Sequence, residues 1–155
     1  MPPRLHAVDI SALSELVGRE FGPSRWVEVD EERIRAFAAA TDDRQWIHVD
    51  AERARRELPL GRTIAHGYLT LSLAPVLLAE LLEVGACSRI VNYGIDKLRL
   101  KEPVPAGSRL RLAGSILGVR SVPRGAARLS MGLRWELEGA ARPACTAEVV
   151  YVYYP

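Results

Sequence analysis

The chain has 155 residues, of which 48% are hydrophobic, so it is long enough for one domain with a substantial core. Lysine and arginine outnumber aspartate and glutamate by only 21 to 19, and the charges are interspersed, which argues against a nucleic-acid partner. The first residues lack the apolar stretch of a signal peptide, and no run approaches the roughly 18 apolar residues of a membrane span. We therefore expect a cytoplasmic protein that binds neither nucleic acid nor membrane.

The first two-thirds of the chain is predicted to be mainly helical. Residues 25–29 alternate like a short strand, and Asp30 can cap a helix with one apolar face over residues 34–41. A second short helix is expected to open at Asp50 and to stop before Pro59. The polar stretch between these two helices is expected to form a loop.

A longer apolar segment follows. Residues 69–84 are apolar on nearly all sides and long enough for about four turns of helix. Such a helix belongs inside a protein core, and it is too short to span a bilayer. Pro75 is expected to kink it or to mark a local irregularity.

From Arg89 onward the hydrophobic pattern has a period of two, which indicates β-strands. Turn signals separate the alternating runs at spacings that favour an antiparallel meander. Helices followed by strands predict an α+β domain, with one antiparallel sheet wrapped around one buried helix. The clearest alternation covers residues 97–101, 109–112, 133–137 and 148–153.

The loop TDDRQWIHVD (41–50) contains residues with potential for chemistry. Asp43 and His48 could present a carboxylate and an imidazole to one water molecule, since such a pair can take a proton from water and return one to a neighbouring carbon. Loop composition alone favours a structural role, in which an aspartate caps the helix and His48 makes one buried hydrogen bond. A metal site with Asp50 as a further ligand fits no established spacing and is not expected.

His66 and Gly67 lie directly before the long apolar segment. Backbone N–H groups in the first turn of a helix have no partner within the helix, and a glycine there lets a carbonyl oxygen approach them closely. Gly67 could therefore form an oxyanion hole. The alternative, more common for an isolated His-Gly pair, is that Gly67 permits a tight turn while His66 caps or packs.

The two cysteines, Cys87 and Cys145, are far apart in the sequence and match no metal-binding or redox spacing. Free thiols in a reducing compartment are therefore expected, and neither thiol is predicted to be catalytic.

Three ordered segments resemble the MaoC-like (R)-specific enoyl-CoA hydratases, in the branch that includes nodulation protein N-like members. The family motif is phenylalanine, alanine, two variable residues, threonine-glycine-aspartate, a variable residue, asparagine-proline, an aliphatic residue and histidine, and FAAATDDRQWIH (37–48) resembles it. IAHGYLTLSLAP (64–75) is similar to the start of the family's central helix, and NYGIDKLRLKEPVPAGSRLR (92–111) to its first long strand. Agreement of three segments in type and spacing favours the catalytic interpretation.

The resemblance covers about Trp26 to the C-terminus and implies a single hotdog domain over residues 1–155, with 1–25 as a lead-in. In this fold an antiparallel sheet wraps around a long central α-helix. The family's catalytic aspartate and histidine fall on Asp43 and His48, and its oxyanion contact falls on the backbone N–H of Gly67. The residues expected to contact substrate are Gln45, Trp46, His66, Tyr68 and Ser72.

The sequence departs from the family motif at three positions, because Asp42, Gln45 and Trp46 replace its glycine, asparagine and proline. Gln45 is a longer amide that can still form hydrogen bonds. Trp46 and Ile47 are expected to pack beside the catalytic pair, anchor the loop and help to exclude bulk water.

The resemblance implies a lyase of fatty acid metabolism, which hydrates trans-2-enoyl-CoA to (R)-3-hydroxyacyl-CoA or catalyses the reverse dehydration. No metal or redox cofactor is implied, acyl carrier protein could replace coenzyme A, and a homodimer is expected because hotdog domains usually pair. The alternatives are a non-catalytic acyl-thioester-binding subunit and, less favoured, a hotdog thioesterase. The basic residues that could hold the carrier's phosphates are Lys97, Arg99, Lys101, Arg109 and Arg111.

Overall fold

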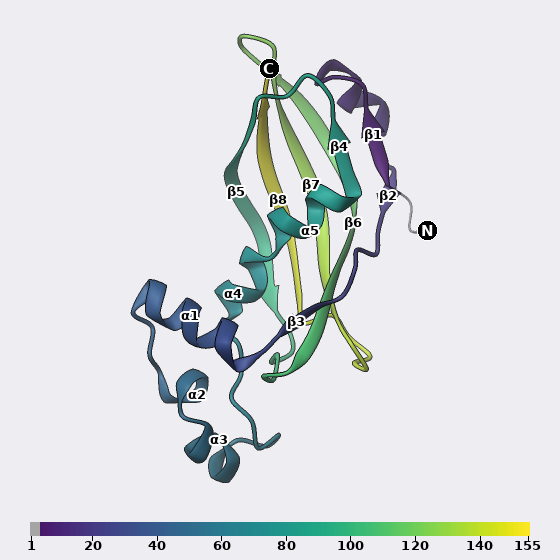
Figure 1. Cartoon of the computed structure of the whole chain (residues 1–155). Coiled ribbons are helices and arrows are strands. Elements are labelled where there is room, and N and C mark those ends of the chain that lie inside the picture. Colours follow the sequence, from purple (N-terminus) through teal and green to yellow (C-terminus); the bar gives the residue numbers. More distant parts are fainter. Residues whose placement is uncertain (1–3) are drawn as a thin grey trace.

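An antiparallel sheet lies across two consecutive helices at the centre of the molecule (Figure 1). The computed structural model describes residues 4–155. The main sheet is six-stranded, with the order β2-β6-β7-β8-β5 and with β3 also paired to β6. Its strands are β2 (Glu20–Phe21), β3 (Val27–Val29), β5 (Arg89–Leu100), β6 (Ser108–Val122), β7 (Ala126–Leu137) and β8 (Cys145–Tyr154). The predicted sheet around a buried helix is confirmed.

The remaining elements are a small second sheet and the helices. In the second sheet, β1 (Leu5–Ala7) pairs in parallel with β4 (Leu82–Val84). The helices are the 3-10 helix η1 (Ser11–Leu16), α1 (Glu31–Thr41), α2 (Trp46–Val49), α3 (Ala51–Glu57), α4 (Gly67–Ser72) and α5 (Ala74–Leu81). Every helix in the described part of the chain falls short of what a membrane span requires in length and hydrophobicity.

The central helix consists of two segments, α4 and α5, which meet at Leu73. The irregularity predicted at Pro75 is confirmed, because this residue lies at the start of α5, where a proline's missing N–H costs no hydrogen bond. The prediction of helix as far as residue 84 was wrong, since residues 82–84 form β4 against the distant β1. The buried stripe repeats every four residues, at Leu69, Leu73, Leu77 and Leu81.

The predicted strand order is partly wrong. Strands β6, β7 and β8 form the expected meander, but β5 pairs with β8 rather than with β6. Residues 101–107 therefore carry the chain across to the other side of the sheet, and β5 becomes an edge strand. Its alternation is also interrupted, because Lys97 has a φ of 51° and the register shifts between Asp96 and Arg99. Local periodicity reports that a strand exists but not which strand it pairs with.

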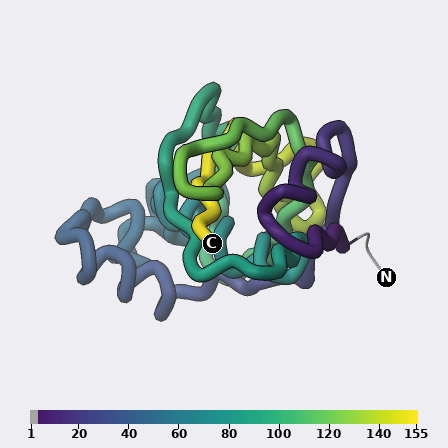
Figure 2. Tube along the Cα trace, turned by 90° about the horizontal axis from the view of Figure 1, so that it is seen from above, coloured from purple at the N-terminus to yellow at the C-terminus, as the bar shows by residue number. Residues whose placement is uncertain are grey.

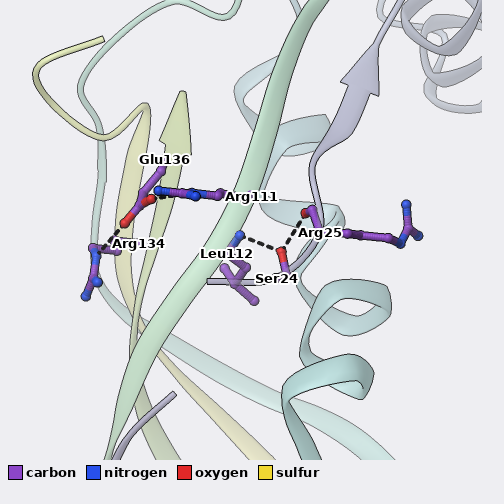
Figure 3. A network of polar contacts seen from close by, with 6 residues as sticks. All are labelled: Ser24, Arg25, Arg111, Leu112, Arg134 and Glu136. Carbon is purple, nitrogen blue, oxygen red and sulfur yellow. Dashed lines mark hydrogen bonds and ion pairs between the residues drawn. The ribbon is translucent and has the colours of Figure 1, made fainter. Parts of the chain in front are cut away.

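The N-terminal segment is attached to β6 by buried polar contacts (Figure 3). The Ser24 hydroxyl donates to the Arg25 carbonyl at 2.9 Å and accepts from the backbone N–H of Leu112 at 2.9 Å. On the neighbouring strand, Glu136 pairs with Arg111 at 2.6 Å and with Arg134 at 3.0 Å. Residues expected to be a lead-in thus contribute β1, β2 and η1 to the fold.

Helices α1, α2 and α3 lie to one side of the sheet, opposite the N-terminal elements (Figures 1 and 2). The predicted helix start at Asp30 is confirmed, because its side chain accepts from the Arg33 N–H at 2.8 Å. Asp50 caps α3 in the same way, accepting from the Arg53 N–H at 2.9 Å. The expected loop between α1 and α3 is shorter than predicted, since α2 occupies residues 46–49.

Candidate active site

Three side chains predicted to be functional converge where the loop after α1, α2 and the start of α4 meet. An Asp43 carboxylate oxygen, a His48 ring nitrogen and a His66 ring nitrogen all lie within 4.8 Å of one another. His48 and His66 are buried, with exposed fractions of 8% and 2%, whereas Asp43 is exposed. The fold therefore brings together the carboxylate and imidazole that the loop sequence suggested as a pair.

The backbone around this pair explains two departures from the family motif. Asp42 ends α1 in the left-handed region, with a φ of 58°, which is the conformation that favours the motif's glycine. Trp46 is the first residue of α2, a position that tolerates proline but does not require it. The Trp46 ring lies under the Arg53 guanidinium, 4.0 Å from ring centre to Cζ.

We expect Asp42→Gly to stabilise the protein. A left-handed conformation strains residues that have a Cβ, while aspartate tolerates it better than most. Removing the Cβ should raise the free energy of unfolding by about 0.5 kcal/mol, because the exposed contact with Arg44 at 3.7 Å contributes little. Urea denaturation measures the change, and a lower midpoint for Asp42→Gly would contradict the strain argument.

The tautomer of His48 is fixed by a backbone carbonyl. Its Nδ1 lies 2.6 Å from the Ile64 oxygen, and because a carbonyl only accepts, Nδ1 carries the proton and Nε2 is left with a lone pair. Burial lowers the pKa of His48 below its ordinary value, and His66 lowers it further, although the Ile64 hydrogen bond and the Asp43 charge oppose this. His48 is therefore a neutral imidazole near neutral pH, with Nε2 available as a proton acceptor.

His48 and Gly67 line the same cavity of about 260 Å³. A Cβ built on Gly67 would lie 2.2 Å from the Leu100 Cδ1, so a larger residue there would displace Leu100. Gly67 does not have a positive φ, so a side chain there would meet the Leu100 side chain rather than a backbone constraint. Its N–H belongs to the first turn of α4, where helical N–H groups have no partner within the helix.

The five residues expected to contact substrate do not line this cavity, as far as residues 4–155 show. Gln45 is exposed, Trp46 is half-buried beneath Arg53, and His66 is enclosed behind His48. Tyr68 is 69% exposed, and Ser72 lines a different cavity while donating to the Tyr68 carbonyl at 2.6 Å. The difference arises because Tyr68 and Ser72 lie on other faces of α4 than Gly67 does.

The cavity includes residues that the sequence interpretation missed. Thr70 is 3% exposed and follows Gly67 by three residues, so the two share one face of α4. That spacing could have identified Thr70 from the sequence. Glu102 was also not predicted, and it lines the cavity just after β5 together with Lys101, which was expected only as a possible contact for the carrier's phosphates. The place of both residues depends on the crossover of residues 101–107, which local periodicity does not indicate.

The site is poorly arranged to hold a metal ion. The rings of His48 and His66 are stacked, with centroids 3.8 Å apart and planes inclined by 23°, so their in-plane lone pairs do not converge. One nitrogen of each ring faces a backbone carbonyl. Asp50, a ligand in the disfavoured metal interpretation, caps α3 instead.

The two thiols are free, as predicted. Cys145 is buried, and burial raises the pKa of its thiol to about 11, so it remains protonated and is a poor nucleophile at neutral pH. Cys87 is half-buried and lies between β4 and β5 in the chain.

Comparisons with known proteins show which family the chain belongs to. Residues 13–128 match the family model described as MaoC like domain, which begins earlier than Trp26. The chain is 42% identical over 144 residues to 3-hydroxyacyl-thioester dehydratase Z of Mycobacterium tuberculosis, covering 93% of this chain and 95% of that protein. It is 36% identical over 149 residues to nodulation protein N of Rhizobium meliloti, covering 96% and 92%. An (R)-hydratase from A. caviae involved in PHA biosynthesis has a TM-score of 0.68 at 26% identity, covering 90% of this chain and 96% of that one.

Proposed function

The chain belongs to the MaoC-like dehydratase family and has its hotdog fold, and from this premise we propose that it hydrates trans-2-enoyl thioesters to (R)-3-hydroxyacyl thioesters or catalyses the reverse dehydration. The observation that carries the proposal is the tautomer of His48. Its Nδ1–H donates to Ile64, which leaves Nε2 unprotonated on a ring that lies close to Asp43 and lines a cavity together with Gly67. The relatives named 3-hydroxyacyl-thioester dehydratase and (R)-hydratase support the thioester substrate.

In the proposed mechanism, Asp43 and His48 hold a water molecule between them. As the water oxygen bonds to C3 of the enoyl thioester, His48 Nε2 takes one of its protons, and the pair returns a proton to C2 on the same side. The thioester carbonyl gains negative charge during this step, and the Gly67 N–H stabilises it by a hydrogen bond. The pair gains one proton and gives one back, so no cofactor is consumed.

We propose that the acyl chain lies in the apolar groove between the central helix and the edge of the sheet. A cavity of about 450 Å³ is lined there by Leu71, Ser72 and Pro75 of the helix and by Tyr93 and Ile95 of β5. A smaller cavity of about 110 Å³ continues the groove and shares Pro75 with it. Ser72 would contact the substrate from this groove, on the same helix that begins with Gly67.

We propose Lys101 as the basic residue that contacts the phosphorylated carrier, whether coenzyme A or acyl carrier protein. Of the five basic residues considered, Lys97, Arg109 and Arg111 are paired with glutamates. Lys101 lines the cavity and has no acidic partner within the described residues. It therefore offers an uncompensated charge next to the site of chemistry.

The proposal is tested by adding purified protein to crotonyl-CoA and to a longer-chain analogue and following the loss of absorbance of the conjugated enoyl thioester. We expect loss of absorbance with at least one chain length, and the preferred length reports the depth of the groove. Binding of acyl-CoA without turnover on either would favour the non-catalytic subunit. Release of free coenzyme A would favour the thioesterase.

We also propose a homodimer that pairs through β5. This strand is at the edge of the sheet, and Ile90, Val91, Tyr93 and Ile95 on it are 43% to 58% exposed. An exposed apolar edge strand offers unpaired backbone groups to another strand, and a second copy supplies an equivalent edge.

Light scattering should give twice the mass of one chain for the wild type. We expect Val91→Lys to shift the protein towards monomer, because it places a charge on the paired edge. Val8→Lys is the matched control, since Val8 is 69% exposed and lies outside β5. A monomeric wild type would refute the proposal.

We place the protein in the cytoplasm as part of the same proposal. Two free thiols, of which Cys87 is half-buried, support a reducing compartment. Fractionation of the source cells followed by immunodetection tests the placement, and recovery outside the cytoplasmic fraction would contradict it.

A further inference from the structure

His66 lies at the start of α4, but its side chain does not cap the helix. It is the N-cap residue of α4, where a side-chain oxygen usually accepts from the backbone, and no side-chain capping bond is present there. Instead, the His66 Nε2 lies 3.0 Å from the main-chain oxygen of Asp43. Because a carbonyl only accepts, Nε2 carries the proton and donates it. The ring thereby ties the start of α4 to the loop after α1.

The same ring supports His48 from one side. The two imidazole centroids are 3.8 Å apart, and the planes are inclined by only 23°. Phe37 of α1 contacts the His66 ring as well, at 4.9 Å between centroids. His66 is therefore packed among α1, α2 and α4 and is only 2% exposed.

We propose that His66 is a positioning residue for the reaction: its Nε2–H holds the backbone of Asp43 while its ring supports His48, so that one side chain sets the spacing of both. The inference rests on the proposed function, because it assigns His66 a role through the Asp43–His48 pair. It replaces the expected direct contact with substrate.

Two observations separate this role from substrate binding. His66 does not line the cavity of His48 and Gly67, within the described part of the chain. Its remaining nitrogen, Nδ1, is buried and has no hydrogen-bond partner among residues 4–155. With the proton on Nε2, that Nδ1 carries a lone pair, so it has no proton to give to a substrate.

The first test needs no turnover, so it stays informative if the protein proves inactive on every thioester tried. Nitrogen NMR of histidine-labelled protein distinguishes the two neutral imidazole tautomers. The chain has 3 histidines, and His6→Gln, His48→Gln and His66→Gln assign their signals. We expect the proton on Nε2 in His66 and on Nδ1 in His48. A His66 ring protonated on Nδ1 instead would overturn the proposal, because it could not donate to Asp43.

The second test uses two substitutions that separate the packing of the His66 ring against His48 from its hydrogen bond to Asp43. His66→Phe keeps an aromatic ring against His48 but removes the donor and leaves the Asp43 carbonyl without this partner. We expect kcat on crotonyl-CoA to fall roughly ten- to a hundredfold, with KM changed by less than about threefold. His66→Gln keeps an N–H donor and should recover part of the lost kcat. The exposed His6→Gln is the matched control and should behave as wild type.

The outcomes are distinct. A rise in KM with unchanged kcat would assign His66 to substrate binding, and wild-type kcat in His66→Phe would remove it from the reaction altogether. If His66→Phe does not fold, His66→Gln and the tautomer measurement decide. An inactive wild type with the expected tautomers would refute the proposed function while leaving the arrangement around His66 intact.

Discussion

Replacing His48 with glutamine is expected to lower kcat for enoyl-CoA hydration by roughly 10²- to 10⁴-fold, the range that a general base contributes. Glutamine has no nitrogen that can accept a proton at neutral pH, although its amide can still donate to the Ile64 carbonyl. The loss should therefore fall on the chemical step rather than on the fold. Asp43→Asn should have a comparable effect, because it removes the other group that holds the water.

Steady-state kinetics with crotonyl-CoA measures this loss, and thermal unfolding checks that the variants fold. His6→Gln makes the same substitution at an exposed site and should retain full activity. Wild-type rates in either His48→Gln or Asp43→Asn would refute the assignment of the catalytic pair.

The pH dependence of the activity should also show that His48 acts as the base. His48 acts as a base only when Nε2 is unprotonated, and burial lowers the pKa of His48 below about 6.5. Activity should therefore be constant through neutral pH and fall as the pH drops through that lowered pKa. Stability follows the same sign, because the unfolded chain binds the proton at a higher pH than the folded protein does. The contribution of His48 to stability is present above its unfolded pKa and is lost as the pH falls. An activity decline that begins above pH 6.5 would contradict the assignment of His48 as the base.

The second large effect is expected for Gly67→Ala, which should reduce kcat by roughly 10²- to 10³-fold, the usual cost of removing an oxyanion contact. The added methyl group would meet the Leu100 Cδ1 at 2.2 Å and crowd the approach to the Gly67 N–H. Leu100 is 56% exposed and can move, so the free energy of unfolding should change little. Gly67→Ala should thus lose activity without losing stability.

Two further variants identify the cause of the loss. Gly118→Ala is the matched control, because a Cβ there meets no described atom within 4 Å, and it should be active. Adding Leu100→Ala to Gly67→Ala removes the clash but not the methyl group beside the N–H. If the methyl group blocks the carbonyl oxygen, the double variant stays inactive. Full activity in Gly67→Ala alone would exclude the oxyanion role.

The parts of the fold that sequence predicted are those set by neighbouring residues. Asp30 and Asp50 cap the helices expected after them because a cap depends on residues three apart. Pro75 marked the break between α4 and α5 because a proline's effect on a helix is also local. By contrast, β4 forms because residues 82–84 meet residues 5–7, and the edge position of β5 depends on β8. Neither pairing leaves a local pattern.

In the site, too, the features set by neighbouring residues were predicted and those set by distant residues were not. Asp43 lies in the loop after α1 and His48 follows five residues later in α2, so the local chain path brings them together in space. The groups that define how they act come from elsewhere in the chain: the Ile64 carbonyl sets the His48 tautomer, and Leu100 fills the space beside Gly67. A backbone carbonyl has no signature in the sequence, so the sequence could suggest the pair but not its protonation.

The most direct measurement of the central claim is mass spectrometry of the products formed from crotonyl-CoA in water enriched in heavy oxygen. Addition of water to C3 predicts an intact 3-hydroxybutyryl-CoA that carries the heavy oxygen, and chiral analysis should identify it as the (R) form. Heavy oxygen in a free carboxylate, released with coenzyme A, would mean that water attacks the carbonyl. No change in either crotonyl-CoA or the longer-chain analogue would mean that the pair does not activate water. Either result would contradict the roles assigned to Asp43 and His48.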